Sequence, residues 1–216
     1  MVISEKKPFE EILMYLKGSE KIIITGCSLC ATVCQVGGEE QVLEMKQKLE
    51  ENGKKVLGYT ILDPSCNYLK VRKDLKKLKE ELKEADAILS LACGDGTQTV
   101  ARLVDIPVIP GNNTEFIGEI ERVGKYEEAC RACGNCQLGW TGGICPVTKC
   151  AKGLLNGPCG GAKDGKCEVN PENDCAWILI YERLKKLGKL DNLKEIKKPR
   201  NYEISAHPAR VNLRNK

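Results

Sequence analysis

Residues 21–27 read KIIITGC, a run of β-branched residues that predicts a buried strand ending in a cysteine. Two further runs follow the same plan, KVLGYTIL at residues 55–62 and AILSLA at residues 87–92. A fourth, shorter strand is expected at residues 107–109. Segments with helical spacing lie around these strands, at residues 8–17, 39–51, 69–84 and 96–103. Strands that alternate with helices predict parallel β-α-β units, so the expected fold class is α/β.

Cysteines follow three of the predicted strands. Cys27 ends the first strand, Cys66 follows the second and Cys93 follows the third. In parallel sheets of the Rossmann or flavodoxin-like type, ligands bind beyond the carboxyl ends of the strands. Cys30 and Cys34 lie in the loop after Cys27, so five thiols are expected to compete for the four ligand positions of one [4Fe–4S] cluster at this rim. The alternative for Cys66 and Cys93 is that they are small buried apolar side chains.

The turn after the third strand reads CGDGT and resembles part of a phosphate-binding loop. Gly94, Gly96 and Thr97 are therefore candidate cofactor-binding residues, although the full dinucleotide fingerprint is absent. A simpler role is that the glycines let backbone N–H groups approach cluster sulfurs, where such hydrogen bonds help to set the reduction potential.

A second concentration of cysteines spans residues 130–175 and holds eight of the 13 in the chain. The first three have the spacing C-x2-C-x2-C, which resembles the bacterial ferredoxin pattern for a [4Fe–4S] cluster. Glycines between them let the chain wrap tightly, as several thiolates around one inorganic centre require. The eight candidate ligands are Cys130, Cys133, Cys136, Cys145, Cys150, Cys159, Cys167 and Cys175.

Two other interpretations of this stretch remain open. A disulfide scaffold needs an oxidising compartment, but residues 1–21 carry charges throughout and lack the apolar region of a signal peptide. An odd number of cysteines also fits full pairing poorly. Structural zinc in an all-cysteine site is the stronger rival for part of the stretch. We expect two or three [4Fe–4S] clusters, with zinc as the alternative at one cysteine site.

The composition of the chain argues against two classes of protein, nucleic-acid binders and membrane-spanning proteins. Charged residues make up 30% of the 216 residues, but the signs are mixed and the net charge is only +4. A dedicated nucleic-acid binder would concentrate lysine and arginine on one face, so no nucleic-acid partner is expected. No apolar run reaches the length of a transmembrane helix, so we expect no membrane insertion and a cytoplasmic location.

Three regions are expected along the chain. Residues 1–124 form the α/β domain with the rim site, and residues 125–188 form a cysteine-rich, irregular domain. Residues 115–128 carry a weak helical pattern, and residues 176–187 predict an amphipathic helix. Residues 189–216 read either as a disordered end or as an extended arm on a partner, anchored by Tyr202 and Ile204. The only histidine, His207, is expected at the surface.

The later motifs resemble a known family. CRACGNC, TGGICPVTKCAKGLLNGPCGG and DCAWILIYERL, within residues 130 to about 202, resemble the methylenetetrahydrofolate reductase C-terminal domain family. GCSLCATVCQVGGEEQV, DPSC and LACGDGTQ resemble the N-terminal part of the small iron–sulfur subunit that accompanies the catalytic subunit of this reductase in acetogenic anaerobes.

This resemblance implies a non-catalytic, electron-transfer subunit of a heteromeric 5,10-methylenetetrahydrofolate reductase of the Wood–Ljungdahl pathway. The implied partners are a catalytic subunit that carries the flavin, and an electron carrier such as ferredoxin or another redox subunit. The resemblance implies [4Fe–4S] clusters, and zinc as well. The alternative is a zinc-stabilised adaptor that assembles the reductase with a methyl-carrying protein and has no redox role.

Overall fold

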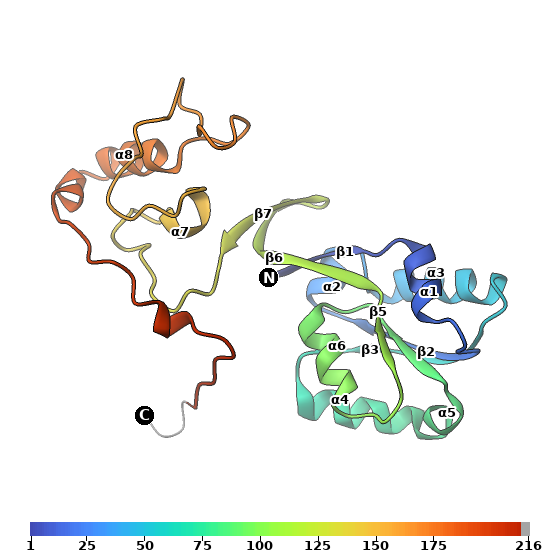
Figure 1. The fold of residues 1–216 in the computed structure, drawn as a ribbon. Helices are drawn as coiled ribbons and strands as arrows, with labels where there is room; N and C mark the ends of the chain where they lie inside the picture. Colours follow the sequence, from blue (N-terminus) through green and yellow to red (C-terminus); the bar gives the residue numbers. More distant parts are fainter. Residues whose placement is uncertain (213–216) are drawn as a thin grey trace. The chain divides into compact units, whose positions relative to one another are not determined.

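A computed structural model describes residues 1–212 of the chain (Figure 1). The chain divides into two compact units, Met1–Glu127 and a second that begins at Glu128. Each unit is described by itself below. Among the described residues, no helix combines the length and apolar character needed to cross a lipid bilayer.

The first unit contains the predicted parallel sheet. Its four strands lie in the order β3-β2-β4-β5, and each pairs with its neighbour in parallel. The strands are β2 (Lys21–Cys27), β3 (Lys55–Leu62), β4 (Ala87–Ser90) and β5 (Val108–Pro110). The α/β prediction is therefore confirmed, and three strands that each precede a cysteine, β3, β2 and β4, are neighbours.

Helices cover both faces of this sheet, and the alternation of side chains along β2 explains why (Figure 1). Ile22 and Ile24 pack with residues of α1 and α3 in one core cluster. Ile23 points to the opposite face and packs with residues of α4 and α6. The helices of this unit are α1 (Phe9–Tyr15), α2 (Cys30–Val33), α3 (Glu39–Glu51), α4 (Tyr68–Leu75), η1 (Lys76–Leu78), α5 (Lys79–Glu84) and α6 (Gly94–Ala101).

The segment expected to be one helix at residues 69–84 is broken. Its two α-helices are separated by the tighter 3₁₀ turn η1. Leu78 and Leu82 still pack against the cluster that contains Val71 and Leu75. Four apolar positions of this segment therefore still face the sheet across the break, whereas Leu69 is exposed.

A second sheet was not predicted, and the helix expected at residues 115–128 is wrong. Strand β1 (Val2–Lys6) pairs antiparallel with β6 (Asn112–Arg122), which continues through a two-residue turn into β7 (Lys125–Cys130). Gly124 supplies the positive φ of 82° in that turn. The sheet forms because β6 finds a partner more than 100 residues away in β1, and local periodicity cannot reveal such a partner.

The second unit is mostly irregular. Its helices are α7 (Pro146–Lys149), α8 (Ala176–Lys186), η2 (Leu190–Lys194) and η3 (Tyr202–Ser205). Helix α8 confirms the predicted amphipathic helix and ends one residue early. The buried core of this unit is small, with Trp177, Ile180 and Leu184 from α8 packed beside Cys175.

The segment after α8 folds back on its own unit. Asn192 donates a hydrogen bond to the carbonyl of Trp140 (2.8 Å), and Arg200 donates one to the carbonyl of Cys133 (3.3 Å). Residues 189–205 are therefore not a detached end. Tyr202, Ile204 and His207 are exposed, so the role of the first two as partner anchors stays a prediction. Residues 213–216 of the predicted tail lie outside the described residues.

Replacement of Gly37 by alanine is expected to destabilise the first unit by about 3 kcal/mol or more, because overpacking against backbone cannot relax. A Cβ at this position would overlap the Leu91 carbonyl oxygen, and the Gly37 carbonyl accepts a hydrogen bond from the Cys27 N–H at 2.8 Å. Thermal unfolding would measure the loss. Gly139→Ala is the control, since nothing lies within 4 Å of its added Cβ. Equal melting of the two variants would contradict the prediction.

Candidate metal centres

Three cysteines from separate loops meet at the carboxyl edge of the parallel sheet. Cys27 ends the central strand β2, while Cys66 and Cys93 follow the two strands that flank it. The Ser65 hydroxyl donates a hydrogen bond to the Gly26 carbonyl at 3.2 Å, which ties the Cys66 loop to the end of β2. We call Cys27, Cys66 and Cys93 the rim trio.

The thiols of the rim trio affect one another's pKa. Burial raises the pKa of the Cys66 thiol, the carboxylate of Asp95 raises it further, and so do the thiols of Cys93 and Cys27. Burial likewise raises the pKa of Cys93, with a smaller contribution in the same direction from Cys27. Thiols held close together in partly buried surroundings can share one metal centre, because a bound cation would stabilise all of their thiolates.

Helix α6 begins at the rim trio, with Cys93 at its N-cap. The backbone N–H groups of Gly96 and Asp95 face the Cys93 sulfur and oppose the rise in its pKa. Gly96 also permits close packing, since a Cβ there would lie 2.6 Å from the Cβ of Ser65. This glycine therefore brings the Cys66 loop against the start of α6.

The other two residues of the predicted cofactor-binding turn already have partners. The Gly94 N–H donates to the Thr114 hydroxyl at 2.8 Å, and the Thr97 hydroxyl donates to the Ser90 hydroxyl at 3.0 Å. Both bonds hold α6 against strands. Binding of a small cofactor by Gly94, Gly96 and Thr97 stays a prediction, and the interactions seen here position the helix and the Cys93 sulfur.

The remaining cysteines of the first unit lie on and just after the short helix α2. Cys34 is buried with Ile3 and Val36, and its thiol donates to the Val2 carbonyl at 3.9 Å. Burial raises the pKa of Cys34. Cys30 is half-buried at the start of the helix. Cys34 thus has the surroundings of a packed apolar side chain, whereas Cys30 is more accessible.

In the second unit, four cysteines line one small cavity of about 20 Å³. Such a volume is close to that of a single water-sized sphere. The four come from different parts of the irregular chain, and Cys175 also caps α8. We call this group the cavity set, and its members are Cys150, Cys159, Cys167 and Cys175.

Backbone and charged groups act on the cavity set in opposite directions. Backbone N–H groups of Asn170 and Val169 lower the pKa of Cys167, and the carboxylate of Glu168 opposes this effect. Lys152 forms an ion pair with Glu168, and the Cys159 thiol donates a hydrogen bond to a carboxylate oxygen of Glu168 at 3.3 Å. The positive charge of Lys152 near these sulfurs is therefore balanced by Glu168.

The cavity described above is not lined by the other four cysteines of the second unit, Cys130, Cys133, Cys136 and Cys145. Cys133 lies in the wall of a separate pocket. The chain does wrap around them, since Ala132 and Gly134 have positive φ angles of 48° and 73°. The Ala132 N–H donates to the Cys130 sulfur at 3.3 Å. Their assignment to one centre stays a prediction from the spacing.

The donor chemistry fits a thiolate-bound metal, while the present arrangement is not a finished coordination sphere. All 13 cysteines have free thiols. Within residues 1–212, no group of three or more His, Cys, Asp or Glu side chains is arranged so that it could hold a metal ion directly. The thiols of the cavity set would have to turn inward on binding.

Sequence reasoning missed the residues that support the thiols. Ser65, Lys152 and Glu168 have no motif of their own, and each acts through a partner distant in the chain. The only signal available was proximity to cysteine, since Ser65 precedes Cys66 and Glu168 follows Cys167.

Comparisons with known proteins address part of the chain. No curated protein and no solved structure matches it. Residues 109–203 match the model of a family described as methylene-tetrahydrofolate reductase C terminal. This region contains the cavity set, the C-x2-C-x2-C run and helix α8. Residues 109–203 of the chain are therefore similar to the methylene-tetrahydrofolate reductase C-terminal family.

Proposed function

We propose that the protein is an iron–sulfur electron-transfer subunit of a heteromeric 5,10-methylenetetrahydrofolate reductase. Its partners would be a flavin-bearing catalytic subunit and an electron carrier such as ferredoxin or another redox subunit. The observation that carries the proposal is the rim trio, in which three thiols remote in sequence lie together at the edge where parallel sheets bind ligands. The family match of residues 109–203 supports the link to the reductase.

The rim trio and one further thiol would hold a [4Fe–4S] cluster, which stores and releases single electrons when bound. Cys30 is the fourth ligand we favour, because it is more accessible than Cys34. The N–H groups at the start of α6 would point at the sulfur of Cys93 and stabilise its negative charge. The carboxylate of Asp95 has the opposite effect on Cys66, because its negative charge raises the pKa of that thiol.

The second unit would hold two centres. The C-x2-C-x2-C spacing of Cys130, Cys133 and Cys136 favours a second [4Fe–4S] cluster, for which Cys145 is the fourth ligand we propose. The four cysteines that line one small cavity favour a single tetrahedral zinc.

Metal analysis tests this assignment. Protein purified without oxygen is expected to be brown and to contain roughly eight irons, eight sulfides and one zinc per chain. Electron paramagnetic resonance of the dithionite-reduced protein should show signals from two clusters. Colourless protein that contains zinc alone would exclude the electron-transfer function.

The second candidate function is a zinc-stabilised adaptor, and the four cysteines that line one cavity favour it. An adaptor would capture the catalytic subunit and leave turnover intact after its iron is removed. The electron-transfer subunit would lose reductase activity with its natural electron carrier on the same treatment. Activity of the complex before and after anaerobic removal of iron, with zinc retained, separates the two functions.

A further inference from the structure

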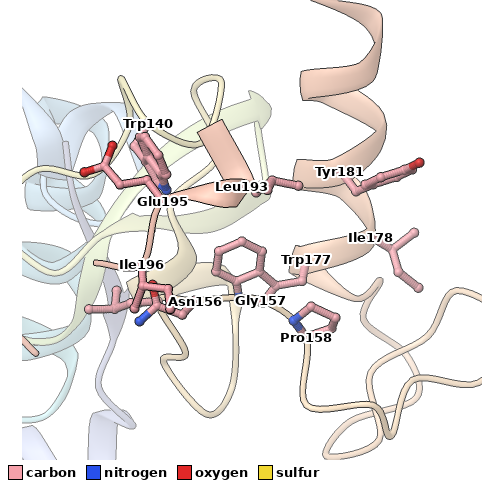
Figure 2. Close-up of a pocket in the computed structure, with 11 residues that line it drawn as sticks. Trp140, Asn156, Gly157, Pro158, Trp177, Ile178, Tyr181, Leu193, Glu195 and Ile196 are labelled. Atoms are coloured by element: carbon pink, nitrogen blue, oxygen red, sulfur yellow. The ribbon is translucent and has the colours of Figure 1, made fainter. Parts of the chain in front are cut away.

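An aromatic-lined cavity lies within the second unit, next to the cavity set, and Pro158 and Trp177 line both cavities. Its volume is about 400 Å³. Figure 2 shows side chains from α8, from the loop before it and from the segment after it arranged around this space. The principal wall residues are Trp140, Pro158, Trp177, Tyr181, Leu193 and Ile196. Both tryptophans of the chain are among them, although aromatic residues make up only 5% of the sequence.

Hydrogen bonds fix two of the wall side chains in place. The Trp177 indole N–H donates to the Leu154 carbonyl at 3.0 Å. The side-chain amide of Asn156 forms two bonds with the backbone of Lys197, at 2.9 and 2.7 Å. Walls held in this way are preformed, and they offer an incoming molecule mainly apolar and aromatic surface, with the Trp140 indole N–H and the Tyr181 hydroxyl as polar groups.

The charges at the cavity are also paired. Glu195 is the one charged residue on the cavity wall among the described residues, and its carboxylate lies 3.0 Å from the Lys197 ammonium. That ammonium lies 3.6 Å from the centre of the Trp140 ring. A charged ligand would find no unpaired countercharge here and would have to give up its hydration.

We propose that this cavity is a binding site for an uncharged, planar aromatic molecule. Its volume falls in the range of small-molecule sites, roughly 300–1,000 Å³. Ring stacking against the tryptophans favours a flat partner over a saturated one of the same size. Ile196 is 83% exposed, so the cavity can be reached from solvent. This proposal does not depend on the identity of the metals.

The neutral dye N-phenyl-1-naphthylamine tests the site with the full chain as purified. Bound dye should fluoresce and receive energy from the tryptophans, since both line the cavity. Ile196→Ser and Trp140→Ala are expected to weaken binding about tenfold, the equivalent of one lost stacking or apolar contact. Val123→Ser is the matched control, because Val123 is also exposed, at 65%, and lies in the first unit.

A pair of competitors tests the ligand class. Naphthalene-1-methanol should displace the dye at a several-fold lower concentration than its decahydro analogue, which has the same carbon skeleton but is not flat. Equal displacement by the two would overturn the aromatic preference. Absence of dye binding, or equal binding by wild type and both cavity variants with unchanged circular dichroism, would overturn the site. An apolar side chain of a protein partner would then be the better occupant.

Discussion

Removal of metal is expected to unfold the second unit and leave the first unit folded. The reason is the difference between their cores. The first unit buries two cysteine-free clusters on opposite faces of a sheet, besides a third that includes Cys27 and Cys34. The second unit buries only a few side chains around α8, with Cys175 among them. Binding of a structural zinc supplies about 10–16 kcal/mol in small domains that depend on it, which exceeds the stability of most domains.

Tryptophan fluorescence and hydrogen exchange would measure this effect separately in each unit. Trp140 and Trp177 both lie in the second unit, and the first unit has no tryptophan. Chelation under anaerobic conditions should shift the tryptophan emission to longer wavelength. It should also remove exchange protection from α8 while β2 and β4 stay protected.

Single-residue variants test whether metal bound by the cavity set keeps the second unit folded. Cys159→Ser is expected to lower the zinc content by about one ion per chain and to reproduce the fluorescence shift without a chelator. Ala151→Ser is the control, since Ala151 is exposed and lies next to Cys150. Retention of the protected α8 after complete loss of zinc would show that apolar packing alone holds the second unit.

The parallel sheet could be predicted because its strands carry their own signal. The β-branched run of β2 and the turn residues after β3 are local features of the sequence. Because ligands bind beyond the carboxyl ends of parallel strands, the sequence alone predicted that Cys27, Cys66 and Cys93 lie at the same edge of the sheet. Strands β6 and β7 could not be predicted in the same way. Strand β6 pairs with β1, which lies at the other end of the unit, and β7 pairs with β6. The glutamates of β6 gave residues 115–128 a helical appearance.

Which cysteines share a metal centre could also not be predicted from the sequence. Spacing placed all eight later cysteines in one glycine-rich stretch and could not separate them. The three-dimensional path does separate them, because four line one cavity and the other four do not. In an irregular chain, which thiols meet depends on turns with positive φ such as those at Gly153, Gly157 and Gly160. No periodic pattern encodes those turns.

The second large effect is expected at the rim. Replacement of Cys66 by alanine should remove one cluster, about four irons per chain, whereas replacement of Cys34 by alanine should leave the iron content unchanged. Cys66 is exposed, and its pKa responds to both other thiols of the rim trio. Cys34 is 7% exposed and packs on Ile3 and Val36, so alanine would fill nearly the same space.

Iron analysis and electron paramagnetic resonance of the two variants would show which of the two cysteines is a cluster ligand. Cys30→Ala is the third variant of the series. Cys30→Ala should resemble Cys66→Ala if Cys30 is the fourth ligand. The fold of the first unit should survive in all three variants, because its two main core clusters contain no cysteine. Loss of iron on replacement of Cys34 instead of Cys30 would mean that α2 turns its buried face to the cluster. Ile3 and Val36 would then have to repack, and the cost of doing so would appear as a lower melting temperature of the metal-free protein.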